Sequence, residues 1–261
     1  MELAEWLTLV ITTAPAIANP STFIIESQFK SIVDSGLSAC QVVLCFDGNE
    51  VDESDDLLDV KCKRLGSNED IEKYELYKTA ARKLATSMLP RVKFAEAPRR
   101  LGLTHNLKNG VDLVTTKYIF VIQDDLILVR PVDFKAIIET MYEDSDIKLV
   151  RFAWGTNRLH QDVMHTHYSP VTTPEFVGTW NGITLSRSSQ YSDNNHIASV
   201  DYYHSLVFPI TLKQRSFMEH SLVDLPARGL GAHKIWGTWY YGAYEDGHYL
   251  QHLDSRYYVG Q

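Results

Sequence analysis

Two adjacent carboxylates, Asp124 and Asp125, follow an apolar run over residues 117–122, with Gln123 between the run and the pair. Neighbouring carboxylates repel each other. The usual relief is a hard divalent cation, which takes oxygen ligands and is commonly completed by substrate phosphates. In open α/β sheets, ligands bind outside the carboxyl ends of the strands, which is where this pair falls if 117–122 is a strand. The pattern therefore indicates a divalent cation and a nucleoside diphosphate. An Asp pair that caps the following loop is the alternative.

The elements that would position this pair are visible in the apolar patterning. Residues 7–13 and 41–46 are apolar runs bounded by turn residues, which predicts two buried strands, and 22–33 has helical spacing. A strand, a helix and a strand within about 40 residues are typical of a βαβ unit with a parallel sheet. Further helices are predicted over 71–89, 103–114 and 134–142, and further strands over 92–95, 117–122 and 148–154. Order resumes over 180–189, and the periodicity is weaker beyond it.

Composition narrows the class of protein. The chain has 261 residues, 44% of them apolar, and its 25 basic and 33 acidic side chains give a formal charge of −8. It has no run of Lys or Arg, so we expect no nucleic-acid partner and no binding to anionic lipid. The apolar stretch from Leu7 to Ala18 is too short to span a bilayer, which predicts no membrane segment and a cytoplasmic location. Cys40, Cys45 and Cys62 lack a metal-binding spacing and are expected to be thiols.

The region around the acidic pair resembles a known family. Arg99-Arg-Leu-Gly102, Leu103-Thr-His-Asn106, Gly110-Val111 and the run from Thr116 to Asp125 are similar to the stretch leading to the metal-binding DxD motif of GT-A glycosyltransferases, particularly glycosyltransferase family 2. The resemblance implies a GT-A-like α/β fold with a mostly parallel sheet flanked by helices. It also implies a single domain over 1–261, with a nucleotide-binding half at about 1–125 and an acceptor-binding half at about 126–261.

The resemblance implies a set of nucleotide-sugar contacts in the first half. Residues at the end of the first strand would contact the base, Asp47 would contact the base or ribose, and Arg100 would reach the nucleotide or diphosphate. Gln123 stands where the family often has Asp, and it can still hydrogen-bond a ribose hydroxyl. Asp125 would ligate the metal. The full implied set is Thr12, Thr13, Ala14, Asp47, Arg100, Asn106, Gln123, Asp124 and Asp125. A surface Arg and a helix-start Asn are the alternatives for residues 100 and 106.

In the second half the resemblance is less specific. Trp180, Asn181 and Gly182 would form the acceptor-side loop, with a turn before a core strand as the alternative. Glu219 would present the catalytic base, although His220 replaces the family's usual following Asp. Two alternatives stay open for the base, Glu245 and Asp246. His252 would close over the diphosphate and ligate the metal together with Asp125, and His248 is the rival position.

These residues imply an enzyme that transfers a sugar from a nucleoside-diphosphate sugar, most simply a UDP-sugar, to a hydroxyl of a carbohydrate acceptor. Mn²⁺ or Mg²⁺ is the implied cofactor, and inversion with Glu219 as base is the expected course, with retention left open. A binding protein without catalytic activity is the first alternative, because Gln123 and His220 depart from the family pattern. A sugar-phosphate nucleotidyltransferase is the second, although Ala14 to Ala18 lacks the glycine and arginine expected of one.

Overall fold

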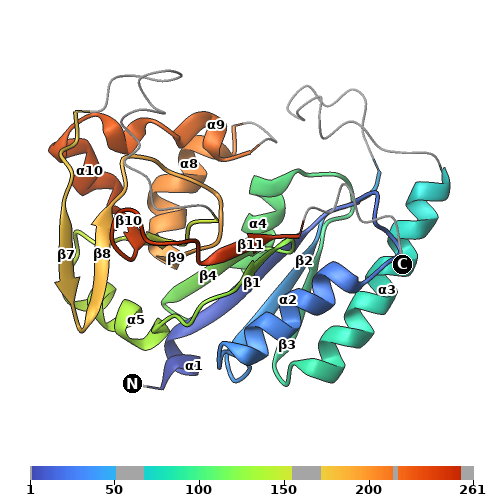
Figure 1. Cartoon of the computed structure of the whole chain (residues 1–261). Coiled ribbons are helices and arrows are strands. Elements are labelled where there is room, and N and C mark those ends of the chain that lie inside the picture. Colours follow the sequence, from blue (N-terminus) through green and yellow to red (C-terminus); the bar gives the residue numbers. More distant parts are fainter. Residues whose placement is uncertain (1, 51–67, 155–171, 214–216, 254–261) are drawn as a thin grey trace.

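The computed structural model describes residues 2–50, 68–154, 172–213 and 217–253 (Figure 1). Its centre is a nine-stranded sheet with the order β3-β2-β1-β4-β9-β6-β10-β8-β7. Only β9 and β8 run against the other strands of this sheet. The predicted α/β fold, with a mostly parallel sheet flanked by helices, is therefore confirmed.

The parallel part of the sheet is built from the strands predicted in the first half. These are β1 (Leu7–Thr13), β2 (Gln41–Phe46), β3 (Val92–Glu96) and β4 (Tyr118–Gln123). All seven residues of β1 are buried, as expected for a strand covered on both faces. The register aligns Thr12 with Gln123 and Thr13 with Phe46, so β1, β2 and β4 end together at one edge.

Helices cover both faces of this sheet, and each face has its own core. One core combines Leu9 and Ile11 of β1 with helices α2 (Phe23–Asp34), α3 (Asn68–Met88) and α5 (Phe134–Glu143). The other combines Val10 with α4 (Leu103–Val111) and with helices of the second half. A Cβ on Gly110 of α4 would lie 2.2 Å from Cys45 Sγ, so this helix packs unusually close to the strands. Cys40 and Cys45 are buried free thiols, and Cys62 lies outside the described residues.

The second half adds short elements, of which only β6 falls on an individually predicted strand, the one over 148–154. The strands are β6 (Leu149–Arg151), β7 (Val177–Trp180), β8 (Ile183–Arg187), β9 (His196–Ser199) and β10 (Thr238–Tyr241). The helices are α7 (Val200–Tyr202), the π-helix η1 (Tyr203–Val207), α8 (Phe208–Thr211), α9 (Glu219–Leu222), the 3₁₀ helix η2 (Leu225–Ala227) and α10 (Leu230–Trp236). Because β9 inserts between β4 and β6, the two halves share one sheet.

Two further features complete the architecture. A second, two-stranded sheet pairs β5 (Leu126–Leu128) with β11 (Leu250–His252) and so brings residue 252 beside the acidic pair. A short helix, α1 (Leu3–Trp6), precedes β1. Among the described helices, none is both long enough and apolar enough to cross a membrane.

Candidate nucleotide-binding site

A cavity of about 150 Å³ lies at the carboxyl ends of β1, β2 and β4. Its walls come from these three strand ends, from the start of α4 and from Phe217. The lining residues are Thr12, Thr13, Ala14, Asp47, Arg100, Gly102, Leu103, Asn106, Gln123, Asp124, Asp125 and Phe217. The structure thus brings together all nine residues that the sequence resemblance implied for nucleotide binding.

Asp47 organises the wall opposite the acidic pair's strand. Its Oδ1 accepts hydrogen bonds from the backbone N–H groups of Gly48 (2.9 Å) and Leu101 (2.7 Å). Its Oδ2 accepts one from the N–H of Gly102 (3.0 Å) and lies 3.3 Å from Arg100 Nε. Burial raises the pKa of Asp47, while Arg100 and the three N–H groups oppose that rise. Since a carboxylate accepts about four hydrogen bonds, Asp47 is fully engaged, and three of its four contacts hold the 100–102 loop.

Four buried polar atoms of residues that line this cavity have no hydrogen-bond partner among the described residues. They are Oγ1 of Thr13, Nε and Nη1 of Arg100, and Oδ1 of Asn106. The amide Nδ2 of Asn106 is engaged, because it donates to the carbonyl oxygens of Thr13 (3.3 Å) and Cys45 (3.4 Å). An unpaired buried polar group costs about 1–3 kcal/mol, which a polar ligand would recover. The cavity therefore carries a cationic donor and an amide acceptor that are ready for a ligand.

The acidic pair meets a histidine from the C-terminal strand. His252 Nε2 lies 3.3 Å from Asp125 Oδ2, and the backbone N–H of Leu253 donates to the carbonyl of Asp125 (2.8 Å). Burial and the adjacent Asp125 raise the pKa of Asp124 well above its usual range. His248 is exposed and does not line the cavity. The structure therefore places His252, and not His248, beside Asp125.

The positions of Asp125 and His252 fit a divalent cation. Two ligands at right angles, each about 2.1 Å from an octahedral ion, lie about 3 Å apart, close to the observed separation. Carboxylate oxygen and imidazole nitrogen both suit Mn²⁺. Within the described residues there is no group of three or more His, Cys, Asp or Glu that could hold a metal. Protein ligands alone would thus leave coordination positions for substrate phosphate and water.

A segment that the sequence reasoning missed clamps the acidic turn from the other side. Asn195, fully buried, accepts from the backbone N–H of Gln123 (2.9 Å) and donates to the carbonyl of Leu126 (2.7 Å). It thereby spans both ends of the turn that carries Asp124 and Asp125. The Gln123 side chain donates from Nε2 to the backbone oxygen of Asp193 (3.0 Å). The only signal in the sequence is the polar run at 192–195, which has no periodicity to mark it.

Glu219 lies behind this segment. Its Oε1 accepts hydrogen bonds from the Ser192 hydroxyl and from the backbone N–H of Asp193 (3.1 Å). Glu219 does not line the cavity, but Asp193 links it directly to Gln123, which does. Of the rival bases, Asp246 accepts from the N–H of Ala243 (2.9 Å) within its own turn, and Glu245 is exposed. Neither rival lines the cavity, and Glu219 is the candidate that the described hydrogen bonds link, through Asp193, to a lining residue.

The structure does not bring Trp180, Asn181 and Gly182 to the cavity. Asn181 and Gly182 have φ values of 45° and 80° and form the tight turn between β7 and β8. Trp180 Nε1 donates to Asp144 (3.2 Å), and the Asn181 amide donates to Thr140 (3.2 Å) on α5. Figure 1 places this turn beside α5. These three residues therefore form a hairpin turn that does not line this cavity, whereas residues 192–195 lie next to Gln123.

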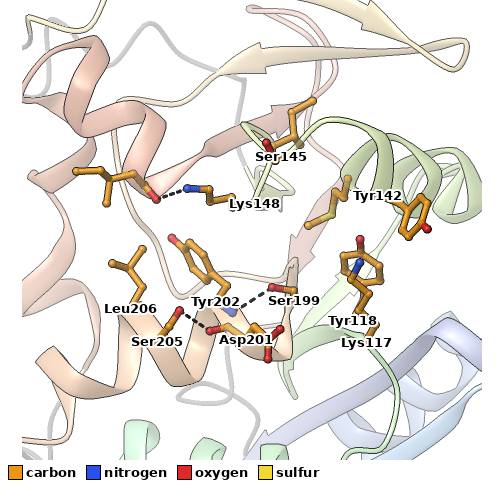
Figure 2. Close-up of a pocket in the computed structure, with 13 residues that line it drawn as sticks. Lys117, Tyr118, Tyr142, Ser145, Lys148, Ser199, Asp201, Tyr202, Ser205 and Leu206 are labelled. Carbon is orange, nitrogen blue, oxygen red and sulfur yellow. Dashed lines mark hydrogen bonds between the residues drawn. The ribbon is translucent and has the colours of Figure 1, made fainter.

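A larger cavity, of about 460 Å³, lies at the amino ends of β4 and β6 (Figure 2). Its two lysines are engaged by the chain. Lys148 Nζ donates to the carbonyl oxygens of Lys234 (2.8 Å) and Ile235 (3.0 Å). Lys117 Nζ lies over the Tyr142 ring, 4.6 Å from its centroid. This cavity shares no residue with the one at the acidic pair, and Arg100, Asp124 and Asp125 all line the smaller cavity.

No protein-family model and no curated protein sequence matches the chain. Among solved structures, it is similar to a mannosyltransferase from Pyrobaculum calidifontis in complex with GDP-Man and Mn²⁺, with a TM-score of 0.46 and 12% identity over 77% of this chain and 46% of that one. It is also similar to glucosyl-3-phosphoglycerate synthase from Mycobacterium tuberculosis, in complex with Mn²⁺, UDP and glucosyl-3-phosphoglycerate. That match has a TM-score of 0.41 and 14% identity over 78% of this chain and 62% of that one.

These likenesses concern the fold alone. The chain spans less than two thirds of the length of either structure. Because both TM-scores lie below 0.5, neither match bears on the substrate or the reaction of this chain.

Proposed function

We propose that this chain is a glycosyltransferase that moves a sugar from a nucleoside-diphosphate sugar to a hydroxyl group of a carbohydrate acceptor. A UDP-sugar is the first donor to test. The observation that carries the proposal is the cavity itself, which combines Arg100, with its unpartnered buried nitrogen, and the Asp124–Asp125 pair at the ends of adjacent parallel strands. A cationic side chain that can bind phosphate and two carboxylates that can bind a metal, in one cavity, suit a diphosphate that is bound through a metal.

The donor would be held by groups of four kinds. Arg100 offers a charged, forked donor for a phosphate. Thr12, Thr13 and Ala14, at the end of β1, form the wall for the base, and Asn106 supplies an amide oxygen. Asp125 and His252 would hold Mn²⁺ or Mg²⁺. When bound, the cation neutralises the charge of the leaving diphosphate as a Lewis acid.

Glu219 is the proposed general base. Its carboxylate takes the proton of the acceptor hydroxyl while that oxygen forms a bond to the anomeric carbon. The bond between the anomeric carbon and the diphosphate breaks, and its electron pair leaves with the diphosphate. Attack from the face opposite the leaving group inverts the anomeric configuration. Ser192 and the Asp193 N–H hold Oε1, so Oε2 is the oxygen left to receive the proton within the described contacts.

A thermal-shift screen tests the donor site. UDP, GDP, dTDP and CMP sugars are compared with and without Mn²⁺. A ligand at 100 times its Kd is expected to stabilise the protein by about 2.7 kcal/mol. Failure of the UDP, GDP and dTDP sugars to shift the melting temperature would contradict the proposal, and so would a shift by CMP sugars alone, because these carry one phosphate. For a donor that binds, slow release of nucleoside diphosphate without acceptor indicates a transferase, whereas binding with no release indicates a carbohydrate- or nucleotide-sugar-binding protein.

A further inference from the structure

Asp193 touches both sides of the proposed site. Its backbone oxygen accepts from Gln123 Nε2 (3.0 Å), and its side-chain Oδ1 lies 3.3 Å from the same nitrogen. Its backbone N–H donates to Glu219 Oε1 (3.1 Å). The residue is 6% exposed, so water does not compete for these contacts. A single buried residue thus contacts one side chain that lines the donor cavity and the side chain proposed as base.

The contacts to Gln123 fix which way its amide faces. A carboxamide has a donor nitrogen on one side and an acceptor oxygen on the other. Since Nε2 is held by two oxygens of Asp193, Oε1 is turned away from Asp193. Gln123 lines the cavity, and its amide oxygen is therefore the atom presented to a ligand. Gln123 then offers an acceptor to a ribose hydroxyl without adding a third charge beside Asp124 and Asp125.

The surroundings of Asp193 support a role in positioning. Arg151, 6% exposed, is the buried cation of the cluster, with Asp193 and Glu219 as its carboxylate neighbours. Burial and the Glu219 carboxylate raise the pKa of Asp193 well above its usual range. Asp193 Oδ2 has no hydrogen-bond partner among the described residues. Placing the carboxyl groups of Asp193 and Glu219 beside a buried arginine has a cost in desolvation.

We infer that Asp193 is a positioning residue that couples the two sides of the site: it orients the Gln123 amide toward the donor and holds Glu219 through its backbone N–H. This inference rests on the proposed function. Because the side chain contributes one hydrogen bond to Gln123, Asp193→Ala is expected to weaken nucleotide binding about three- to ten-fold. Asp193→Asn keeps an acceptor oxygen at this position and is expected to bind as the wild type does.

A double-mutant cycle tests the coupling. The probe is whichever of UDP, GDP and dTDP binds the wild-type protein most tightly with Mn²⁺, and Kd is measured by titration calorimetry. If Asp193 acts on the donor through Gln123, the Gln123→Ala/Asp193→Ala double variant binds no more weakly than Gln123→Ala alone. Additive losses would overturn the inference. Asp34→Ala, an exposed aspartate at the end of α2, is the matched control and should leave Kd unchanged.

A second variant covers the case in which Asp193→Ala does not fold. Gln123→Glu retains two acceptor oxygens for a ribose but sets a carboxylate against the two oxygens of Asp193. It should lose as much affinity as Gln123→Ala, and wild-type affinity in Gln123→Glu would show that Asp193 does not orient residue 123. These outcomes are separable from the proposed function. If the wild-type protein binds none of the three diphosphates, the proposed function fails. If it binds one and the cycle is additive, only the role of Asp193 fails.

Discussion

The two sides of the candidate site are built by different means. On the donor side, Thr12 lies at the end of β1, and Asp47 and Asp124 directly follow β2 and β4, so the register of one parallel sheet brings them together. On the other side, Glu219 opens the four-residue helix α9, and His252 ends the three-residue strand β11. Their positions depend on hydrogen bonds between segments far apart in the chain.

Because of this difference, a substitution on the donor side should have another kind of effect than one on the opposite side. A sheet edge is held by many backbone hydrogen bonds, so a side-chain change on the donor side should alter binding without moving its neighbours. The 192–195 segment is held mainly by side chain–backbone contacts, such as those of Asn195. A change there should alter the position of groups that it does not touch. Substitutions on the donor side therefore test direct contacts with a ligand, and substitutions in residues 192–195 test how neighbouring groups are positioned.

The largest effect is expected for Glu219→Gln. A positioned base typically contributes 10²- to 10⁴-fold, so turnover should fall by about that factor, because the amide cannot take the acceptor's proton. Nucleotide Kd should hardly change, since Glu219 does not line the cavity. Single-turnover kinetics and calorimetry together measure both quantities. The matched control is Asp246→Asn. Normal turnover in Glu219→Gln with loss in Asp246→Asn would move the base to the 243–246 turn.

On the donor side, Asp125→Ala should abolish the Mn²⁺ dependence of nucleotide affinity. Metal stabilisation of phosphate charge is worth several kcal/mol, so the loss should be about 10²-fold or more in the presence of the cation. In EDTA the wild-type and variant proteins should bind alike. His252→Ala should reproduce part of this loss and His248→Ala none of it. Equal wild-type affinity with Mn²⁺ and with EDTA would remove Asp125 from the metal role.

The same contrast explains how far the sequence could be interpreted. The predicted strands 7–13 and 41–46 coincide with β1 and β2, and the donor-side residues follow because adjacent parallel strands must end at one edge. Strand β9 was not predicted, since its four residues are too few for a period-2 pattern and its partners lie at distant positions. Without β9, nothing in the sequence shows that residues 192–195 abut Gln123. The Asn181-Gly182 pair has the signature of a hairpin turn, which is what the structure contains.

As the pH falls, the second half of the chain should lose stability at a higher pH than the first half. Burial lowers the pKa of His196 to about 4, and burial likewise lowers the pKa of His233 to about 4. Because the folded-state pKa lies below the ordinary value, the unfolded chain binds the proton first. The free energy of unfolding is then fully retained above about pH 6.5 and falls as the pH drops toward 4. Each histidine should account for about 2–3 kcal/mol of this loss.

Hydrogen exchange at pH 7 and pH 5 measures this effect region by region. His105 is the single histidine in residues 1–125, and it is half-buried. Amides of β9 and β10 should therefore lose protection before those of β1 and β2. In His196→Gln the dependence of stability on pH should become shallower. A pH dependence that stays the same in this variant would exclude His196 as its source.

The smallest effect on activity is expected at the β7–β8 turn. Trp180→Phe removes the hydrogen bond from Nε1 to Asp144 but keeps an aromatic ring against Trp239, whose centroid lies 5.3 Å away. A net hydrogen bond is worth about 1 kcal/mol, so the melting temperature should fall by about 2–4 °C. Nucleotide Kd and the KM for a carbohydrate acceptor should stay within about two-fold of wild type, because no residue of the β7–β8 turn lines the cavity. Differential scanning calorimetry and initial-rate kinetics with varied acceptor check both expectations. A rise in acceptor KM with an unchanged melting temperature would return Trp180 to the acceptor site, which would then have to extend from residues 192–195 to the hairpin beside α5.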